Sequence, residues 1–464
     1  MKKLLTTICA LVPLIGTVKA QEFTPTQIQQ VKQVTELALD SDLSWQLLES
    51  LTSEVGPRLP GSENDKKAVE WAKQQFEQLG FDKVWLEPAT FPNWRRYRES
   101  GTIITPSKQP LHLTALGNSI GTPKEGLTAP VVMFETLDEL IAAPKGSLEN
   151  KIAFVNYRMN RHIDGNGYGP AVRARNTGAI EAAKKGAIAY MMRSVSTSHH
   201  RFAHTGNSRY KDGVSKIPNT AIANPDADQI ERLLNAGHAV SVNINLQTED
   251  LGEGTSYNVI AEITGSDAPQ QYVLIGGHLD SWDLGTGALD DGAGVALTMA
   301  AATHIKQIAR PKRSIRVVLF AAEELGLWGA KAYFKQHADK LDNIVAAAES
   351  DFGADVVYGF ESSVSANSLP VVRAIAEQLA PLDIKYVRAN NAHGGPDLIP
   401  LRQATNAPIF ALHQDGTDYF DYHHTADDTL DKVDPDKLKQ NTAAYAVFAM
   451  MAANAKTTLT GKNP

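Results

Sequence analysis

The apolar residues near the N-terminus recur at the spacing of amphipathic helices. Over residues 24–51 they fall mostly three or four positions apart, which predicts two short helices. Over residues 62–79 the same spacing predicts one longer helix with Ser62 as its N-cap. Two runs rich in apolar and aromatic residues, 84–91 and 98–104, then predict strands.

A different pattern occupies residues 121–252, where short apolar runs alternate with short helical patterns. The runs expected to form strands are 131–134, 152–155, 189–192 and 239–246, and those expected to form helices are 179–185 and 226–236. This change of character predicts a domain inserted into a larger one.

The histidines of the insert are expected to lie on the surface or in loops, because only one of them, His162, has an acidic residue close to it. The five are His162, His199, His200, His204 and His238. As an alternative, His199 and His200 could line a cleft that faces the larger domain.

From residue 256 onward the pattern becomes that of an α/β fold. The runs 273–277, 314–321 and 344–348 are apolar without alternation, which is typical of strands covered on both faces. Residues 292–309 form a helical pattern of small residues between the first two runs. We therefore expect a mixed, largely parallel sheet sandwiched by helices.

The length of 464 residues is too great for one small domain and fits this division. The expected parts are an export signal, the larger domain in two pieces, and the insert between those pieces. Their boundaries are 1–20 for the signal, 21–120 and 253–464 for the larger domain, and 121–252 for the insert.

The first twenty residues have the three-part pattern of a bacterial export signal. Lys2 and Lys3 precede an apolar stretch that ends near Val18, and the small residue Ala20 stands before Gln21. We expect the mature chain to begin at Gln21 and to be periplasmic or secreted. The alternatives are a buried helix and a membrane anchor, but the stretch is shorter than the ~20 apolar residues of a membrane span.

The composition of the chain argues against nucleic-acid binding and against any role for cysteine. Beyond the first twenty residues, which hold three lysines and no acid, 42 basic residues face 52 acidic ones. A chain this acidic lacks the dense basic face that nucleic-acid binding requires. Cys9, the only cysteine, lies within the export signal, so disulfides and cysteine catalysis are excluded from the mature chain.

Side chains suited to metal binding follow the predicted strands of the larger domain. Because ligand sites lie at the carboxyl ends of parallel strands, we expect these side chains to lie together. They are His278, Asp280, Asp290, Asp291, Glu323, Glu324, Asp351, His423 and His424.

Two pairs of adjacent carboxylates occur in this set, and the two members of each pair are expected to have different roles. Of the adjacent pair Asp290 and Asp291, the first is expected to bridge two cations, although an aspartate here can also simply cap a helix. Of Glu323 and Glu324, one is expected to bind metal while the other stays free as a general base for the attacking water.

The remaining positions complete a set of five ligands. Asp351 adds an oxygen, and His424 is expected to add a nitrogen while its neighbour His423 packs or contacts substrate. Two histidines and three carboxylates suit an open, catalytic site with two zinc ions about 3.5–4 Å apart. Asp280, two residues after His278 on a predicted strand, would share its face and hold its tautomer.

Three segments, 276–283, 288–294 and 423–425, resemble the motifs of the co-catalytic zinc exopeptidases, which include bacterial leucyl aminopeptidase and glutamate carboxypeptidase. The resemblance implies the zinc exopeptidase fold, an insert similar to a protease-associated domain, and a homodimer. It implies Glu323 as the base and Asp290 as the ligand shared by both ions. The implied metal ligands are His278, Asp290, Glu324, Asp351 and His424.

In several of these proteins, a tyrosine upstream of a family-typical aspartate polarises the oxyanion of the transition state. This chain has no tyrosine at that position. Counted from Asp397, that position here is His393. We expect His393 to donate a hydrogen bond to the tetrahedral intermediate instead.

The resemblance also implies the substrate, which is a short peptide, in particular a dipeptide with free termini. Asp283 is a candidate for binding the substrate ammonium. The alternatives are an aminopeptidase acting on longer peptides, a glutaminyl cyclase with one zinc ion, and an inactive binding module. An inactive binding module would lack some of the metal ligands, and none of the five is missing.

Overall fold

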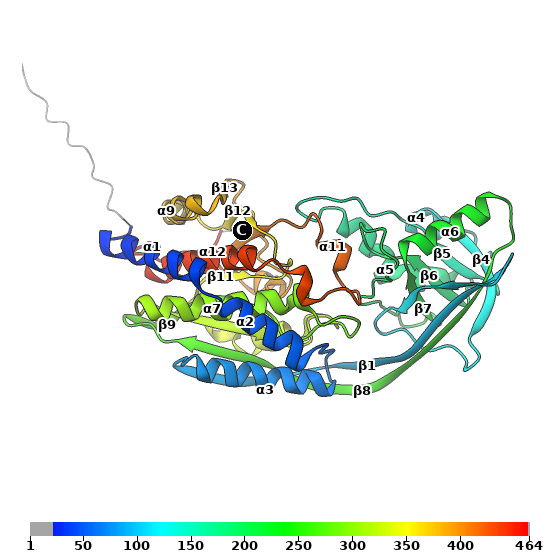
Figure 1. Ribbon diagram of the computed structural model, residues 1–464, viewed down its shortest axis with the longest axis horizontal. Helices are drawn as coiled ribbons and strands as arrows, with labels where there is room; N and C mark the ends of the chain where they lie inside the picture. Colours follow the sequence, from blue (N-terminus) through cyan, green and yellow to red (C-terminus); the bar gives the residue numbers. More distant parts are fainter. Residues whose placement is uncertain (1–21, 463–464) are drawn as a thin grey trace, which may run out of the picture.

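The computed structural model describes residues 22–462 and has two lobes joined by two long strands (Figure 1). The strands are β1 (Lys83–Thr105) and β8 (Ser241–Ile263), which pair antiparallel along most of their length. Both run from the larger lobe into the smaller one, so a single continuous sheet extends through the molecule. The expected export signal lies outside the described residues.

A mixed sheet forms the centre of the larger lobe. β9 pairs in parallel with β10 and β11, and β11 pairs in parallel with β14, whereas β8 and β12 join the sheet antiparallel. The strands are β9 (Ala268–His278), β10 (Arg313–Phe320), β11 (Ile344–Glu349), β12 (Val357–Ser363), β13 (Lys385–Val387) and β14 (Ile409–Gln414). The expected α/β class with a largely parallel sheet is confirmed.

Helices cover both faces of this sheet. Val273 and Ile275 of β9 pack on one side and Leu274 on the other, which is why the strand is apolar without alternation. One face carries α1 (Pro25–Asp40), α2 (Leu43–Ser50), α3 (Glu63–Gln78), α7 (Ala293–Ile308), α9 (Leu369–Leu379) and α12 (Pro435–Asn454). The other face carries α8 (Trp328–Gln336) and α10 (Ile399–Ala404).

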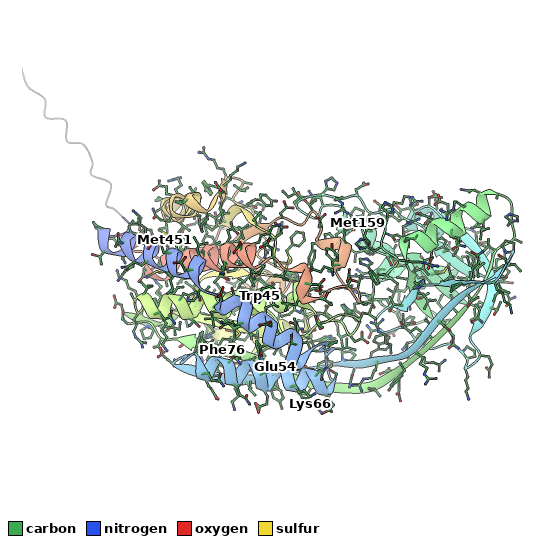
Figure 2. All side chains as sticks on the ribbon, in the orientation of Figure 1. Trp45, Glu54, Lys66, Phe76, Met159 and Met451 are labelled. Carbon is green, nitrogen blue, oxygen red and sulfur yellow. The ribbon has the colours of Figure 1, made fainter. Side chains whose placement is uncertain are left out.

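The amphipathic pattern of the N-terminal region forms the expected helices. In α3, Ser62 acts as the N-cap and its hydroxyl accepts a hydrogen bond from the Asp65 amide at 3.0 Å. Phe76 of this helix is buried against the core, while Lys66 is exposed (Figure 2). Within residues 22–462, no helix is both long and apolar enough to cross a lipid bilayer.

The smaller lobe is built around a second group of strands. β4, β5, β6 and β7 are parallel neighbours, while β3 pairs antiparallel with β7 and β2 pairs antiparallel with β1. The strands are β2 (Gln109–Leu111), β3 (Leu113–Ala115), β4 (Leu127–Phe134), β5 (Ile152–Val155), β6 (Ala189–Arg193) and β7 (Asn219–Ile222). The helices are α4 (Leu137–Ala142), α5 (Tyr168–Lys184) and α6 (Asn224–Asn235).

The two connecting strands differ from the elements that the sequence predicts. The runs 84–91 and 98–104 are the two ends of the single strand β1. The expected end of the insert at residue 252 falls inside β8, because Gly252, at φ 78°, lies in an irregularity opposite the stretch from Pro92 to Trp94 and the strand continues past it. Hydrophobic alternation cannot show where a long strand passes from one lobe into another.

Candidate metal centre

The predicted ligands lie at one edge of the central sheet. β9 ends at His278. Two residues separate the end of β10 from the Glu323–Glu324 pair, and one residue separates the end of β11 from Asp351. Because these strands are parallel neighbours, their carboxyl ends meet. The loop before α7 and the segment after α11 (Tyr419–Tyr422) supply Asp290 and His424.

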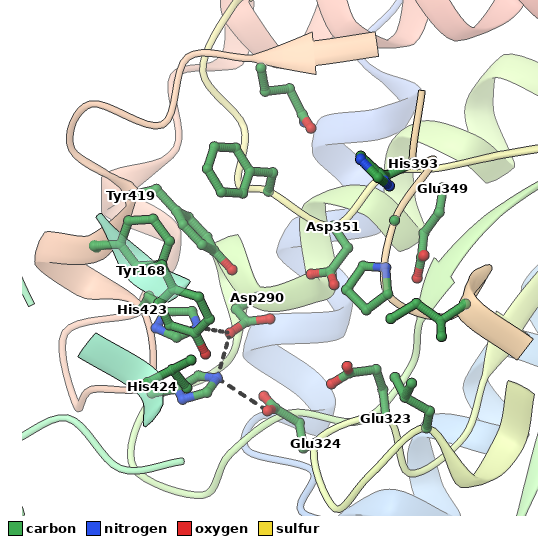
Figure 3. Close-up of a pocket in the computed structure, with 18 of the residues that line it drawn as sticks. Tyr168, Asp290, Glu323, Glu324, Glu349, Asp351, His393, Tyr419, His423 and His424 are labelled. Carbon is green, nitrogen blue, oxygen red and sulfur yellow. Dashed lines mark ion pairs between the residues drawn. The ribbon is translucent and has the colours of Figure 1, made fainter. Parts of the chain in front are cut away.

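Asp290 lies between two groups of side chains and presents one oxygen to each (Figure 3). Its Oδ1 is 3.1 Å from His278 Nε2, which is 3.5 Å from Asp351 Oδ1. Its Oδ2 is 3.1 Å from His424 Nε2, which is also 3.1 Å from Glu324 Oε2. We call these five residues the candidate metal centre.

Two neighbours of these residues take other positions. His423 Nε2 lies 3.5 Å from Asp290 Oδ2, and the His423 ring stacks on that of His424 at a centroid distance of 3.5 Å. Asp290, His423 and His424 together also form a group that could hold a metal ion. Asp291 points away from the pocket, where its carboxylate accepts hydrogen bonds from the amides of His278 and Gly294. The structure thus separates Asp290 from Asp291, whereas His423 and His424 lie together beside Asp290.

Asp280 contacts His278 differently from the expectation. β9 ends at His278, so the two residues do not share a strand face. The Asp280 backbone carbonyl lies 3.0 Å from His278 Nδ1, whereas its carboxylate is 3.8 Å away and accepts the amides of Glu323 and Glu324 instead. Asp280 therefore connects the turn after β10 to the end of β9.

Two further residues, which no sequence pattern indicates, hold the loop between His278 and Asp290. Arg58 is fully buried, and its guanidinium donates hydrogen bonds to three carbonyls of this loop, those of Leu279, Thr286 and Gly287. The Asp428 carboxylate accepts the amides of Leu289 and Asp290.

Carboxylates outnumber cationic side chains around the candidate metal centre. Burial raises the pKa of Glu323, Glu324 and Asp351, and neighbouring carboxylates raise it further. Although burial opposes it, the carboxylates beside His278 raise the pKa of that imidazole, and those beside His424 raise its pKa to about 9.

Two carboxylate oxygens of the centre, Asp290 Oδ2 and Glu324 Oε1, are buried without a hydrogen-bond partner. Buried charges of one sign need paired cations or bound metal ions. The oxygen and nitrogen donors present are those that zinc accepts, so the residues fit the expected metal ions.

A cavity of about 630 Å³ opens onto the centre. Glu323 and His393 lie on its wall, and its aromatic lining includes Phe352, Tyr419 and Phe420. Asp283 does not line this cavity, and its carboxylate pairs with Arg96 at 2.8 Å. The geometry therefore does not support its expected contact with the substrate ammonium.

The smaller lobe also reaches this cavity, through residues that the sequence did not indicate. Tyr168 and Arg175 of α5 line it, whereas His199 and His200 do not. His204 lies in a loop, as expected, but is buried, with Nδ1 2.7 Å from the His423 carbonyl. The other histidines of the insert are exposed, as expected.

The sequence and the fold place this chain among known proteins. A model of peptidase family M28 matches residues 258–449. Carboxypeptidase Q from Homo sapiens is 36% identical over 413 residues, which cover 89% of this chain and 85% of the human protein. The chain belongs to peptidase family M28. This M28 peptidase is therefore an enzyme of the metallo-exopeptidase class that the sequence motifs predicted.

Solved structures agree with this assignment. A peptidase M28 precursor from Shewanella amazonensis SB2B, with a crystal structure at 1.70 Å, superposes on the M28 peptidase with a TM-score of 0.92. The two are 49% identical, and the match covers 95% of this chain and 99% of the other. BSAP, a zinc aminopeptidase from Bacillus subtilis, shares the fold with a TM-score of 0.61 at 18% identity, over 88% of this chain and 93% of its own.

Proposed function

We propose that this M28 peptidase is a zinc enzyme with two metal ions that hydrolyses short peptides, in particular dipeptides with free termini. The observation that supports it most is the position of Asp290, whose two oxygens face two separate groups of ligand atoms. His278, Asp290 and Asp351 would hold one zinc ion, and Asp290, Glu324 and His424 the other. BSAP, which shares the fold, is a zinc aminopeptidase.

The bound zinc ions would polarise the substrate carbonyl and lower the pKa of the attacking water. Glu323 acts as the general base, because it lines the cavity, stands next to Glu324, and forms no ion pair with a member of the candidate metal centre. Its carboxylate takes a proton from the water and delivers it to the leaving amine. Asp280 holds the backbone of this base through the Glu323 amide.

His393 is the proposed hydrogen-bond donor to the tetrahedral intermediate. Its side chain is exposed to the cavity, and Figure 3 places it on the same side of the pocket as Asp351 and Glu349. A donor on the cavity wall stabilises the charge that develops on the carbonyl oxygen during attack.

The preference for dipeptides rests on the similarity to carboxypeptidase Q. The smaller lobe consists of residues 121–252 together with β2, β3 and the adjoining end of β1. We propose that residues 121–252 are a protease-associated domain, which lies over the cavity and limits the length of the substrate. We further propose that residues 1–20 direct export to the periplasm or medium, and that the mature enzyme is a homodimer. Residues 21–120 and 253–464 would then form its catalytic domain, apart from β2, β3 and the adjoining end of β1, which lie in the smaller lobe.

Metal analysis combined with a peptide panel tests this function. The purified mature enzyme should contain about two zinc ions per chain and should cleave a free dipeptide faster than its N-acetylated or C-amidated forms. Efficient trimming of tripeptides and longer peptides would indicate a broader aminopeptidase. One zinc ion together with loss of ammonia from an N-terminal glutamine would indicate a glutaminyl cyclase. Equal rates on free and blocked dipeptides would contradict the proposed specificity.

A further inference from the structure

The smaller lobe places a tyrosine hydroxyl inside the cavity of the candidate metal centre. Tyr168, the first residue of α5, stacks its ring on Phe420 at a centroid distance of 4.9 Å and meets the edge of His423 at 5.6 Å. Figure 3 shows its hydroxyl pointing toward Asp290 and His424. Two aromatic contacts therefore fix the ring, and its polar end faces the centre.

Arg175 determines the direction of the hydrogen bond at this hydroxyl. Arg175 Nη2 lies 2.7 Å from the Tyr168 oxygen. A guanidinium has only N–H donors, so the tyrosine oxygen must accept this bond and its own proton remains available. Among residues 22–462, the Tyr168 hydroxyl donates no hydrogen bond to another protein group. The cavity therefore contains an oriented donor without an acceptor.

The position of Arg175 is itself closely constrained. It lies seven residues, or about two turns, after Tyr168 on the same face of α5, and it is 7% exposed. Its Nη1 is 3.4 Å from His424 Nδ1. A Cβ at position 206 would lie 2.2 Å from the same Nη1. Glycine at this position therefore leaves the space that the guanidinium occupies.

We infer that Tyr168 is a catalytic residue of this M28 peptidase and that Arg175 is its positioning residue. The inference rests on the hydrolytic function proposed above. The Tyr168 hydroxyl donates a hydrogen bond to the carbonyl oxygen of the scissile peptide bond, and this bond strengthens as negative charge develops on that oxygen. No covalent bond to the tyrosine forms, and its proton stays on the phenol.

The location of the hydroxyl favours the reacting carbonyl over a terminal carboxylate of the substrate. Tyr168 faces Asp290, which both ligand groups share and where the scissile bond must lie for water to attack it. It approaches from the smaller lobe, whereas His393 belongs to the larger lobe. The oxyanion would thus receive one donor from each lobe.

Replacement of the hydroxyl tests this role. Tyr168→Phe keeps the ring contacts with Phe420 and His423, so we expect an unchanged zinc content and a similar KM, with kcat lowered about 100-fold. Binding of a phosphinic dipeptide analogue, measured by calorimetry, should weaken at least tenfold. Tyr422→Phe is the matched control, because Tyr422 is on α11 but does not line the cavity, and it should retain the parental kcat.

Arg175 is tested by a double-mutant cycle. Arg175→Gln should lower kcat when Tyr168 is present and should add little to Tyr168→Phe, because both changes remove the same oriented donor. Arg175→Lys, which keeps a cationic donor, should recover part of the lost activity. Independent, additive effects of the two changes would contradict the positioning role.

Two results would overturn the inference for Tyr168. One is a kcat for Tyr168→Phe within twofold of the parent. The other is a rise in KM alone, confined to substrates with a free C-terminus, since this would make Tyr168 a group that binds the substrate carboxylate. Turnover of a free dipeptide by the parent enzyme, assayed in parallel, separates this failure from failure of the proposed hydrolysis, because only the latter predicts that the parent leaves the dipeptide intact.

Discussion

Thr205 of the smaller lobe and His424 of the larger lobe pair through two hydrogen bonds. The Thr205 amide donates to the His424 carbonyl at 3.0 Å, and the Thr205 carbonyl accepts from His424 Nδ1 at 3.2 Å. Because a carbonyl can only accept, Nδ1 carries the proton and Nε2 is left free to face Glu324 and Asp290. The smaller lobe therefore selects the tautomer that a metal ligand requires.

Replacing Glu323 by Gln should abolish hydrolysis without loss of metal. The amide keeps the shape of the side chain but cannot take the proton of the attacking water, so we expect kcat to fall at least 10³-fold. Turnover of a dipeptide and zinc analysis of the same preparation measure the two effects. Loss of zinc together with activity would instead make Glu323 a ligand.

The two adjacent histidines should differ in their effect on metal content. His424 Nε2 approaches both Asp290 and Glu324 at 3.1 Å, whereas His423 approaches Asp290 alone at 3.5 Å. His424→Ala should therefore reduce the bound zinc by about one ion per chain, and His423→Ala should keep both. Mass spectrometry of metal content decides between them, and the reverse result would assign the ligand to His423.

His393→Ala should lower turnover with little change in zinc content. The side chain lines the cavity but lies outside the candidate metal centre, and removal of one donor to an oxyanion typically costs about 100-fold or more in kcat. Steady-state kinetics on a free dipeptide measure the effect. A parental kcat would exclude His393 as a donor and leave that role to Tyr168.

The buried carboxyl of Asp65 should make the enzyme less stable as the pH rises. It accepts hydrogen bonds from the Gly61 amide and the Ser256 hydroxyl, both at 2.8 Å, and burial raises its pKa from 3.8 to about 6. The folded state thus binds the proton more tightly than the unfolded state. The stability gained from protonation is fully present below pH 3.8 and is lost as the pH rises through 6.

Asp65→Asn removes this titration and keeps the shape of the side chain. Between pH 4 and 7, the free energy of unfolding of the variant should therefore rise by roughly 2 kcal/mol relative to the parent. Denaturant unfolding at a series of pH values measures the difference. Glu63→Gln, on the exposed side of α3, is the control and should show a much smaller change; a constant difference for Asp65→Asn would contradict the expectation.

Local sequence patterns were enough to predict the class of fold and the set of side chains available for chemistry. Apolar runs without alternation predict strands covered on both faces, and the residues after such runs lie at a shared edge because the strands are parallel. His278, Asp290 and Asp351 could be identified in this way since each follows or closely adjoins a local pattern. The members of adjacent pairs, such as His423 and His424, are locally alike, so no sequence pattern distinguishes the ligand from its neighbour.

The groups that support these side chains became apparent from the three-dimensional arrangement of the chain. Arg58 binds a loop more than 220 residues later in the sequence, and Arg175 of the smaller lobe lies 249 residues before the His424 that it contacts. The contact of Arg175 with His424 depends on the path of β1 and β8 between the lobes, which carries α5 to the cavity. Local patterns describe periods of two to four residues, so they contain no information about which distant segments the fold brings into contact.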